Sequence, residues 1–184
     1  MHKYAFFLVI LFASSSGQTP SNKPIVLFDS SSGPTPNSKP IEPDVLGVVF
    51  LLDSSNHVLQ PLSNERWKAQ GKRSGWFSAA GFIEIAGEHS EVRVASSRKI
   101  ELIFNVSHPE DVKLYQSLQK KNQRLFEMVK VGPGGRTREP IPGLPVVLTK
   151  YGQSSFKLVP MSPLVPGEYA VIYDGTVMSF GVDN

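Results

Sequence analysis

The clearest pattern of apolar and polar positions lies at the end of the chain, where two alternating runs flank Asp174-Gly175. An Asp-Gly pair favours the left-handed backbone of a two-residue hairpin turn. A turn centred there pairs Tyr173 with Thr176, and it places the bulky residues on one face. We assign that face to the core; it consists of Tyr169, Val171, Tyr173, Thr176, Met178, Phe180 and Val182. The other face is apolar at Ala170, Ile172 and Val177, which predicts that it is also covered in places.

Short apolar runs bounded by turn residues recur from Asp44 onward. Residues 45–52 are almost continuously apolar, which is typical of a strand buried on both faces. Residues 98–106 alternate, with four apolar side chains on one side: Ile100, Leu102, Phe104 and Val106. Further strands are expected at 57–62, 82–86, 92–94, 125–131, 146–150 and 155–160.

The pattern changes once, after residue 106. Ser107 stands where a helix cap would, with Pro109 in the first turn and Glu110 three residues after the cap. Val112, Tyr115 and Leu118 then follow at helical spacing. The sequence therefore predicts one short helix over about residues 110–120, lying over a sheet edge.

Turn residues are frequent throughout, with 15 glycines and 15 prolines in 184 residues, and the hydrophobic content of 40% is adequate for a core. Many short strands joined by such turns are typical of an all-β sandwich. We predict an immunoglobulin-like β-sandwich of about eight or nine strands with one helix, occupying residues 44–184.

The first residues follow the pattern of a secretory signal peptide, residues 1–17. Lys3 gives a positive start, residues 5–13 are apolar, and small residues lead to a cleavage site near Gly17. The apolar run is shorter than the ~20 residues that span a bilayer. We expect a secreted or periplasmic protein; the alternative is an uncleaved segment as its membrane anchor. Residues 18–43 are rich in Pro and Ser and read as a disordered linker.

Composition excludes several kinds of chemistry. The chain has no cysteine, which rules out disulfides, thiolate metal sites and a cysteine nucleophile. A formal charge of +3 does not indicate nucleic-acid binding, because that needs a clustered basic face. The sequence has neither a G-x-S-x-G motif nor a P-loop. No catalytic residue and no cofactor are expected.

Two candidate sites of other kinds are weaker than their structural alternatives. Glu88, His89 and Glu91 could form a metal site at a turn, but no third neutral ligand is near in sequence, so we expect a solvated loop and no metal. A glycoside hydrolase would need two carboxylates at a fixed separation. The acids available on expected strands are Glu84, Glu101 and Glu168.

The stretch from residue 66 to 76 carries the best candidate for ligand binding. Two tryptophans flank four basic residues, and flat aromatic rings stack on sugars while cations hold anionic groups. The candidate site is Arg66, Trp67, Lys68, Lys72, Arg73 and Trp76. The alternative is that both tryptophans fill the ends of the core and the charges face water.

The ending PGEYAVIYDGTVMSFGVD, with FIEIAGEHSEVRV upstream, resembles an uncharacterised domain of secreted bacterial proteins. The resemblance implies an immunoglobulin-like sandwich and brings no catalytic residue with it. We expect a non-catalytic binding or structural module of the cell envelope, whose partner is an envelope polysaccharide or another envelope protein. The alternative is a small extracellular hydrolase that uses carboxylates.

Overall fold

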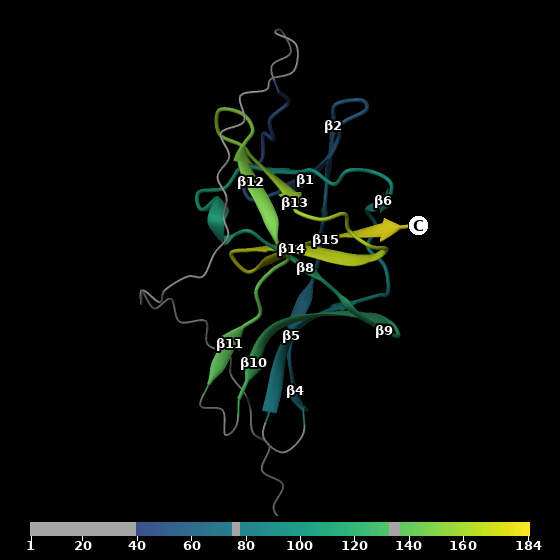
Figure 1. Cartoon of the computed structure of the whole chain (residues 1–184), viewed down its shortest axis with the longest axis vertical. Helices are drawn as coiled ribbons and strands as arrows, with labels where there is room; N and C mark the ends of the chain where they lie inside the picture. The colour runs from purple at the N-terminus through teal and green to yellow at the C-terminus, as the bar shows by residue number, and fades with distance from the viewer. Residues whose placement is uncertain (1–39, 75–77, 133–136) are drawn as a thin grey trace, which may run out of the picture.

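The described part of the chain is all-β, with almost no helix. The computed structural model describes residues 40–74, 78–132 and 137–184 (Figure 1). The predicted signal peptide and most of the predicted linker lie outside these residues. Within them the chain forms fifteen strands and one 3-10 helix, η1 (Pro109–Asp111). The strands form three sheets, here called A, B and C, in which all pairs but one are antiparallel.

Sheet A has the strand order β12-β13-β7-β1-β2. Its strands are β12 (Val146–Lys150), β13 (Phe156–Pro160), β7 (Leu102–Phe104), β1 (Val49–Asp53) and β2 (Val58–Pro61). Sheet B has the order β3-β15-β14-β8, and β6 pairs with β15 in parallel. Its strands are β3 (Ser63–Asn64), β15 (Thr176–Asp183), β14 (Gly167–Tyr173), β8 (Lys113–Gln116) and β6 (Arg93–Ala95).

Sheet C has the order β11-β10-β5-β4, with β9 also paired to β10. Its strands are β11 (Arg138–Pro140), β10 (Gln123–Val131), β5 (Ser78–Ala86), β4 (Trp67–Ser74) and β9 (Leu118–Lys120). Figure 1 shows β14 and β15 in the middle of the molecule, with sheet A on one side of them and sheet C on the other.

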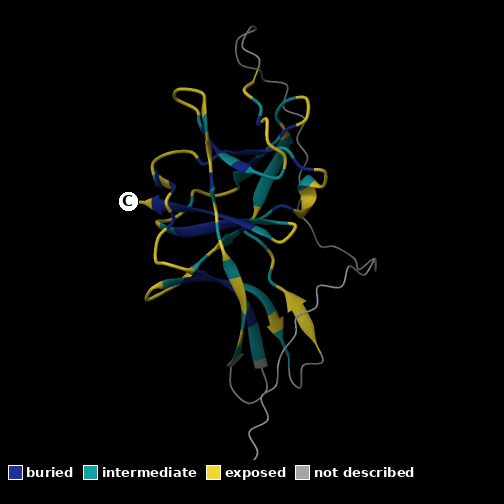
Figure 2. Cartoon of the chain, turned by 180° about the vertical axis from the view of Figure 1, so that it is seen from behind, coloured by how far each residue is buried: buried dark blue, intermediate teal, exposed yellow. Residues whose placement is uncertain are grey.

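The predicted C-terminal hairpin is confirmed, both in its strand register and in which face of it lies in the core. β14 pairs with β15 so that Tyr173 lies opposite Thr176. Both turn residues have positive φ, +45° at Asp174 and +75° at Gly175, as the Asp-Gly pair predicts. The predicted core face enters the main hydrophobic cluster, together with Leu102 and Phe104 of sheet A. The other face is buried as well, so the hairpin is the shared middle layer (Figure 2).

Two clusters of apolar side chains hold the three layers together. The larger lies between sheets A and B and includes Val49, Leu158 and Phe180. The smaller joins sheets B and C; its buried members are Ile83, Ile85, Phe126, Ala170 and Val177. The alternation of β14 and β15 explains this arrangement, because successive side chains of one strand point into different clusters.

The helix predicted over residues 110–120 is wrong. The helical turn η1 ends at Asp111, its cap residue is His108, and no side chain caps it. Beyond it, residues 113–116 form strand β8 and residues 118–120 form strand β9. Leu114 is buried in the main cluster and Tyr115 packs on the smaller one, which is the alternation of a strand. Backbone pairing with β14 outweighs the apparent helical spacing.

The strand number also differs from the eight or nine expected. Several of the fifteen strands are only two or three residues long, and among them β3, β9 and β11 were not expected. Segments this short leave no periodic pattern in a sequence, because alternation needs at least four residues to be seen. The basic stretch after residue 66, to which the pattern assigned no element, is the eight-residue strand β4.

The structure also shows how the end of the predicted linker meets the domain. The Glu42 carboxylate accepts backbone hydrogen bonds from Gln153 and Ser154, at 2.8 and 3.0 Å, and a hydroxyl bond from Ser155 at 2.8 Å. Those bonds, led by the one from the Ser154 backbone, lower the pKa of Glu42 to about 2. Glu42 therefore joins the end of the predicted linker to the loop between β12 and β13, and the boundary at Asp44 stays a prediction.

Candidate functional site

Strand β4 separates the predicted ligand-binding residues onto two faces of sheet C. Trp67 lies opposite Ile85, and its half-buried ring packs on the cluster between sheets B and C. Its indole N–H donates to the Gly175 carbonyl at 2.9 Å. Lys68 lies opposite Glu84, on the other face. Because side chains alternate along a strand, Trp67 cannot share a ligand surface with Lys68 or Lys72.

The remaining members of that predicted site are not brought together with them. Arg66 is exposed just before β4 begins. The backbone of Arg73 pairs with Ala79 in sheet C. Trp76 lies outside the described residues. The structure thus places one tryptophan as a packing residue and leaves the two lysines of β4 on a separate face.

That second face carries a group of lysines around Glu84 and Phe82. Lys68 forms an ion pair with Glu84 at 2.8 Å. The Lys72 ammonium lies 5.8 Å from the centre of the Phe82 ring. Contact with the amine of Lys120 on β9, together with desolvation, lowers the pKa of Lys72 below its usual value. Two lysines from strands far apart in sequence, Lys72 and Lys120, therefore lie on the same face of sheet C.

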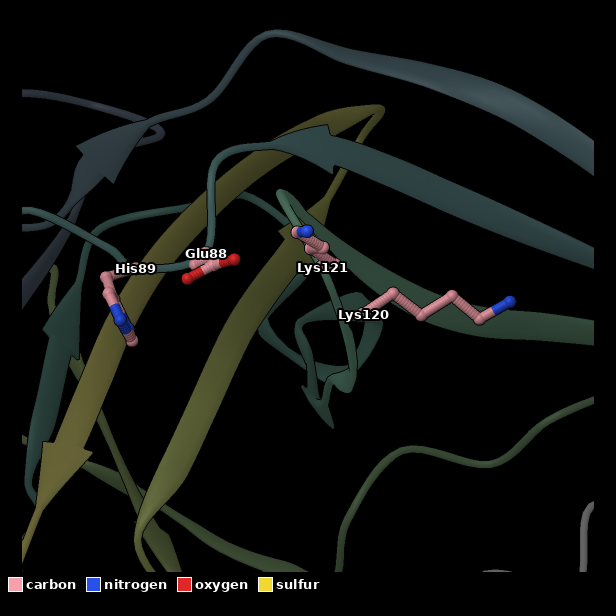
Figure 3. Close-up of a pocket in the computed structure, with 4 residues that line it drawn as sticks. All are labelled: Glu88, His89, Lys120 and Lys121. Atoms are coloured by element: carbon pink, nitrogen blue, oxygen red, sulfur yellow. The ribbon is translucent and has the colours of Figure 1, made fainter.

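Beside this group lies a pocket of about 270 Å³. Its lining residues come from two turns: Glu88 and His89 follow β5, while Lys120 and Lys121 belong to the β9–β10 hairpin (Figure 3). The hairpin turn contains Asn122, whose φ of +62° an asparagine tolerates. All four lining residues are polar and exposed.

Backbone bonds fix the two turns against each other. The Gly87 N–H donates to the Asn122 carbonyl at 3.0 Å. In return the Asn122 N–H donates to the Glu88 carboxylate, also at 3.0 Å. The walls of the pocket are therefore held by reciprocal contacts rather than by chance proximity of two loops.

Behind the pocket a buried polar network connects sheets B and C. Arg124 of β10, with a side chain only 2% exposed, donates to the hydroxyls of Ser90 and Ser179 at 2.6 and 2.8 Å and pairs with Glu65 at 3.1 Å. Glu168 of β14 accepts from the Ser90 backbone at 2.8 Å and from Arg93 at 2.5 Å. A buried arginine needs such partners, because an unpaired buried charge costs several kcal/mol.

The three strand acids considered for hydrolysis are each paired with cations. Burial would raise the pKa of Glu168, but hydrogen bonds from Arg93, Ser90 and His89 hold it below its usual value. Burial would likewise raise the pKa of Glu101, and contacts with Lys99, Ser54 and Lys157 hold it low. A glycosidase acid needs a raised pKa. The carboxyl groups of Glu101 and Glu168 are therefore not suited to act as the general acid.

Two of the three residues considered as a weak metal site, Glu88 and His89, have other partners. Glu88 accepts the Asn122 N–H, and His89 Nδ1 lies 3.3 Å from Glu168. Among the described residues, one group of His and acidic side chains has ligand atoms within 4.8 Å of one another: His108, Glu110 and Asp111, all exposed around η1. Glu110 and Asp111 are neighbours in sequence, and this group carries no further sign of a ligand.

Sequence reasoning missed the basic part of the pocket. It considered Glu88 and His89 only as metal ligands, and it placed Lys120 at the end of a helix. The pair Lys120-Lys121 before a turn-forming Asn122 was the available signal. No pattern indicated that Lys72 of β4 and Lys120 of β9 lie on the same face of one sheet.

In the part of the chain that the structure describes, no helix has the length and apolar content required to cross a membrane.

Comparisons of the chain with protein-family models, with curated proteins and with solved structures give no match.

Proposed function

We propose that the protein is a secreted or periplasmic, non-catalytic binding or structural module of the cell envelope. The observation that carries the non-catalytic part is the pairing of the strand acids: Glu101 and Glu168 are held ionised by neighbouring cations and donors. The binding part is supported by the polar pocket beside the β9–β10 hairpin, whose walls are fixed by backbone bonds.

The fold proposed for this module is an immunoglobulin-like sandwich made by sheets A and B. Their shared core supports it, since one cluster takes residues from both sheets. Sheet C would then be an addition on the outer face of sheet B, attached through the smaller cluster. The likeness of the chain ending to uncharacterised secreted domains is in keeping with this proposal.

Cell fractionation tests the location. A C-terminally tagged chain expressed in its source cells should be found in the envelope or the medium, with a mature N-terminus just after Gly17, as mass spectrometry would show. Recovery of the tagged chain from the cytoplasm with Met1 retained would contradict the proposal.

The alternative, a carboxylate-dependent hydrolase, is tested on the polysaccharide fraction of the same envelope. The purified protein should sediment with this material and release no soluble sugar from it over many hours. If the protein released reducing sugar ends from this material, and a Glu168→Gln or Glu101→Gln variant did not, the protein would be a hydrolase rather than a non-catalytic binding module.

A further inference from the structure

The pocket between the turn after β5 and the β9–β10 hairpin has an excess of positive charge. Lys120 and Lys121 line it with one carboxylate, Glu88. That carboxylate is engaged by the Asn122 N–H. Across the described residues, no acid lies within ion-pair distance of Lys120 or Lys121. Their charges are therefore balanced only by solvent and mobile ions.

A third cation extends this charge onto the face of sheet C. Lys72 and Lys120 belong to strands at opposite edges of sheet C, but the register places them on the same face, since Lys120 lies opposite Gln123, Gln123 opposite Ala86, and Lys72 opposite Ala80. The Glu84 carboxylate, which acts on Lys72 from the same face, is shared with Lys68, with which it forms an ion pair. Like charges gathered on one face repel one another in the free protein. A bound anion at this place would relieve that repulsion.

The pocket's lining indicates which kind of anion fits. None of its four lining residues is apolar. A peptide ligand is often held by apolar side-chain pockets, and the lining of this pocket offers no apolar side chain. Lysine ammonium groups hold carboxylate, sulfate or phosphate as point charges, while Glu88 and His89 supply an acceptor and a ring nitrogen for hydroxyl groups. Hydroxyls and acid groups occur together in acidic sugars.

The size of the pocket agrees with one sugar unit rather than a large ligand. At about 270 Å³ it lies just below the roughly 300–1,000 Å³ typical of pockets for drug-sized molecules. A polymer would place one charged unit in the pocket and continue along the sheet toward Lys72. We propose that Lys72, Lys120 and Lys121 bind an acidic polysaccharide through its anionic groups. This inference rests on the proposed binding function and names its ligand class.

Binding to defined polymers tests this inference. The probes are polygalacturonate, which carries carboxylates, dextran sulfate, which carries sulfates, and neutral dextran, with the purified full chain and biolayer interferometry as the readout. We expect binding to one or both acidic polymers, none to dextran, and weaker binding as salt is raised from about 20 to 300 mM, because exposed charges are screened. The preferred acidic polymer identifies the anionic group.

A matched pair of variants locates the site. Lys120→Gln with Lys121→Gln should weaken binding about tenfold, the loss expected for two exposed charge contacts. Lys72→Gln should weaken it about threefold. The control is Lys99→Gln with Lys150→Gln, which removes the same charge near sheet A and should leave the affinity unchanged. All these lysines are at least partly exposed, so the thermal unfolding of the variants serves to confirm that they are folded.

Three results would overturn the inference. An equal loss of affinity in both double variants would mean that net charge alone attracts the polymer. Binding of poly-glutamate as tight as that of either polysaccharide would point to acidic proteins instead. A chain that sediments with envelope material but binds neither acidic polymer would remove this ligand class and leave the proposed function standing.

Discussion

At the scale of single residues, the role that the sequence suggests for Trp67 differs from the role it has in the structure. Flanked by basic residues, it resembles part of a sugar-binding surface. In the fold its half-buried ring packs on the cluster between sheets B and C, and its N–H is bonded to the turn of the C-terminal hairpin. A side chain so engaged contributes packing, and it lies on the face of sheet C opposite Lys68.

Trp67→Ala should therefore lower the free energy of unfolding and leave polysaccharide binding unchanged. We expect a loss of about 2 kcal/mol, below the value for a fully buried tryptophan because the ring is only half-buried. Trp67→Phe, which keeps a ring and loses the N–H donor, should cost about 1 kcal/mol. Urea unfolding gives the stabilities. If the Trp67→Ala protein kept its full stability and no longer bound polysaccharide, Trp67 would belong to the ligand-binding site.

At the scale of elements, the C-terminal hairpin is the part of the fold that local sequence specifies best. Its turn uses two left-handed residues, Asp174 and Gly175, which match the twist of the paired strands. The space around Gly175 is open, with nothing within 4 Å of the position a Cβ would take. The need for glycine there is therefore one of backbone conformation alone.

Gly175→Ala should destabilise the protein by about 1 kcal/mol, since an alanine at φ +75° is strained while no contact is disturbed. The measurement is a thermal unfolding curve by circular dichroism. Asp174→Asn is the control, because asparagine also tolerates left-handed backbone and should change stability by less than about 0.5 kcal/mol. An unchanged melting temperature for Gly175→Ala would mean that the turn adopts another conformation.

At the scale of the whole molecule, the buried polar network decides how sheet C is attached to sheet B. Arg124 reaches from β10 to the hydroxyls of Ser90 and Ser179, and the carboxylate of Glu168 lies 3.8 Å from it. The side chain of Glu168 is 1% exposed. Such a network fixes the arrangement of two layers, because displacing either one would leave a charge buried without a partner.

Glu168→Gln should cost about 3 kcal/mol at pH 7, the usual loss when one partner of a buried pair is removed. The pKa of Glu168 in the folded protein is below that of an unfolded glutamate, about 4.3. Its contribution to stability is therefore complete above that pH and is lost as the pH falls through the lower, folded value. The stability difference between wild type and variant should shrink between pH 5 and pH 2.

Urea unfolding at several pH values measures this difference. The matched control is Glu91→Gln, an exposed acid near the same turn, which should change stability little at any pH. A difference between wild type and Glu168→Gln that stays constant from pH 7 to pH 2 would show that the carboxylate charge is not what stabilises the attachment of sheet C.

The sequence by itself determined what depends on neighbouring residues. It indicated the all-β class, the Asp174-Gly175 turn with its register, and the alternation that carries Leu102 and Phe104 into the core. These features follow from local backbone preference and from the two-residue period of a strand, both of which act within a few positions of the chain.

The tertiary structure decided what depends on partners distant in sequence. Residues 113–116 are a strand because β14 offers a backbone edge to pair with, although their local pattern favours a helix. Arg124 is buried because Ser90, Ser179 and Glu65 surround it. Lys72 shares a face with Lys120 only because β5 and β10 align β4 with β9 in sheet C. Pairings of this kind are set by the folded neighbours, whose identity no local pattern contains.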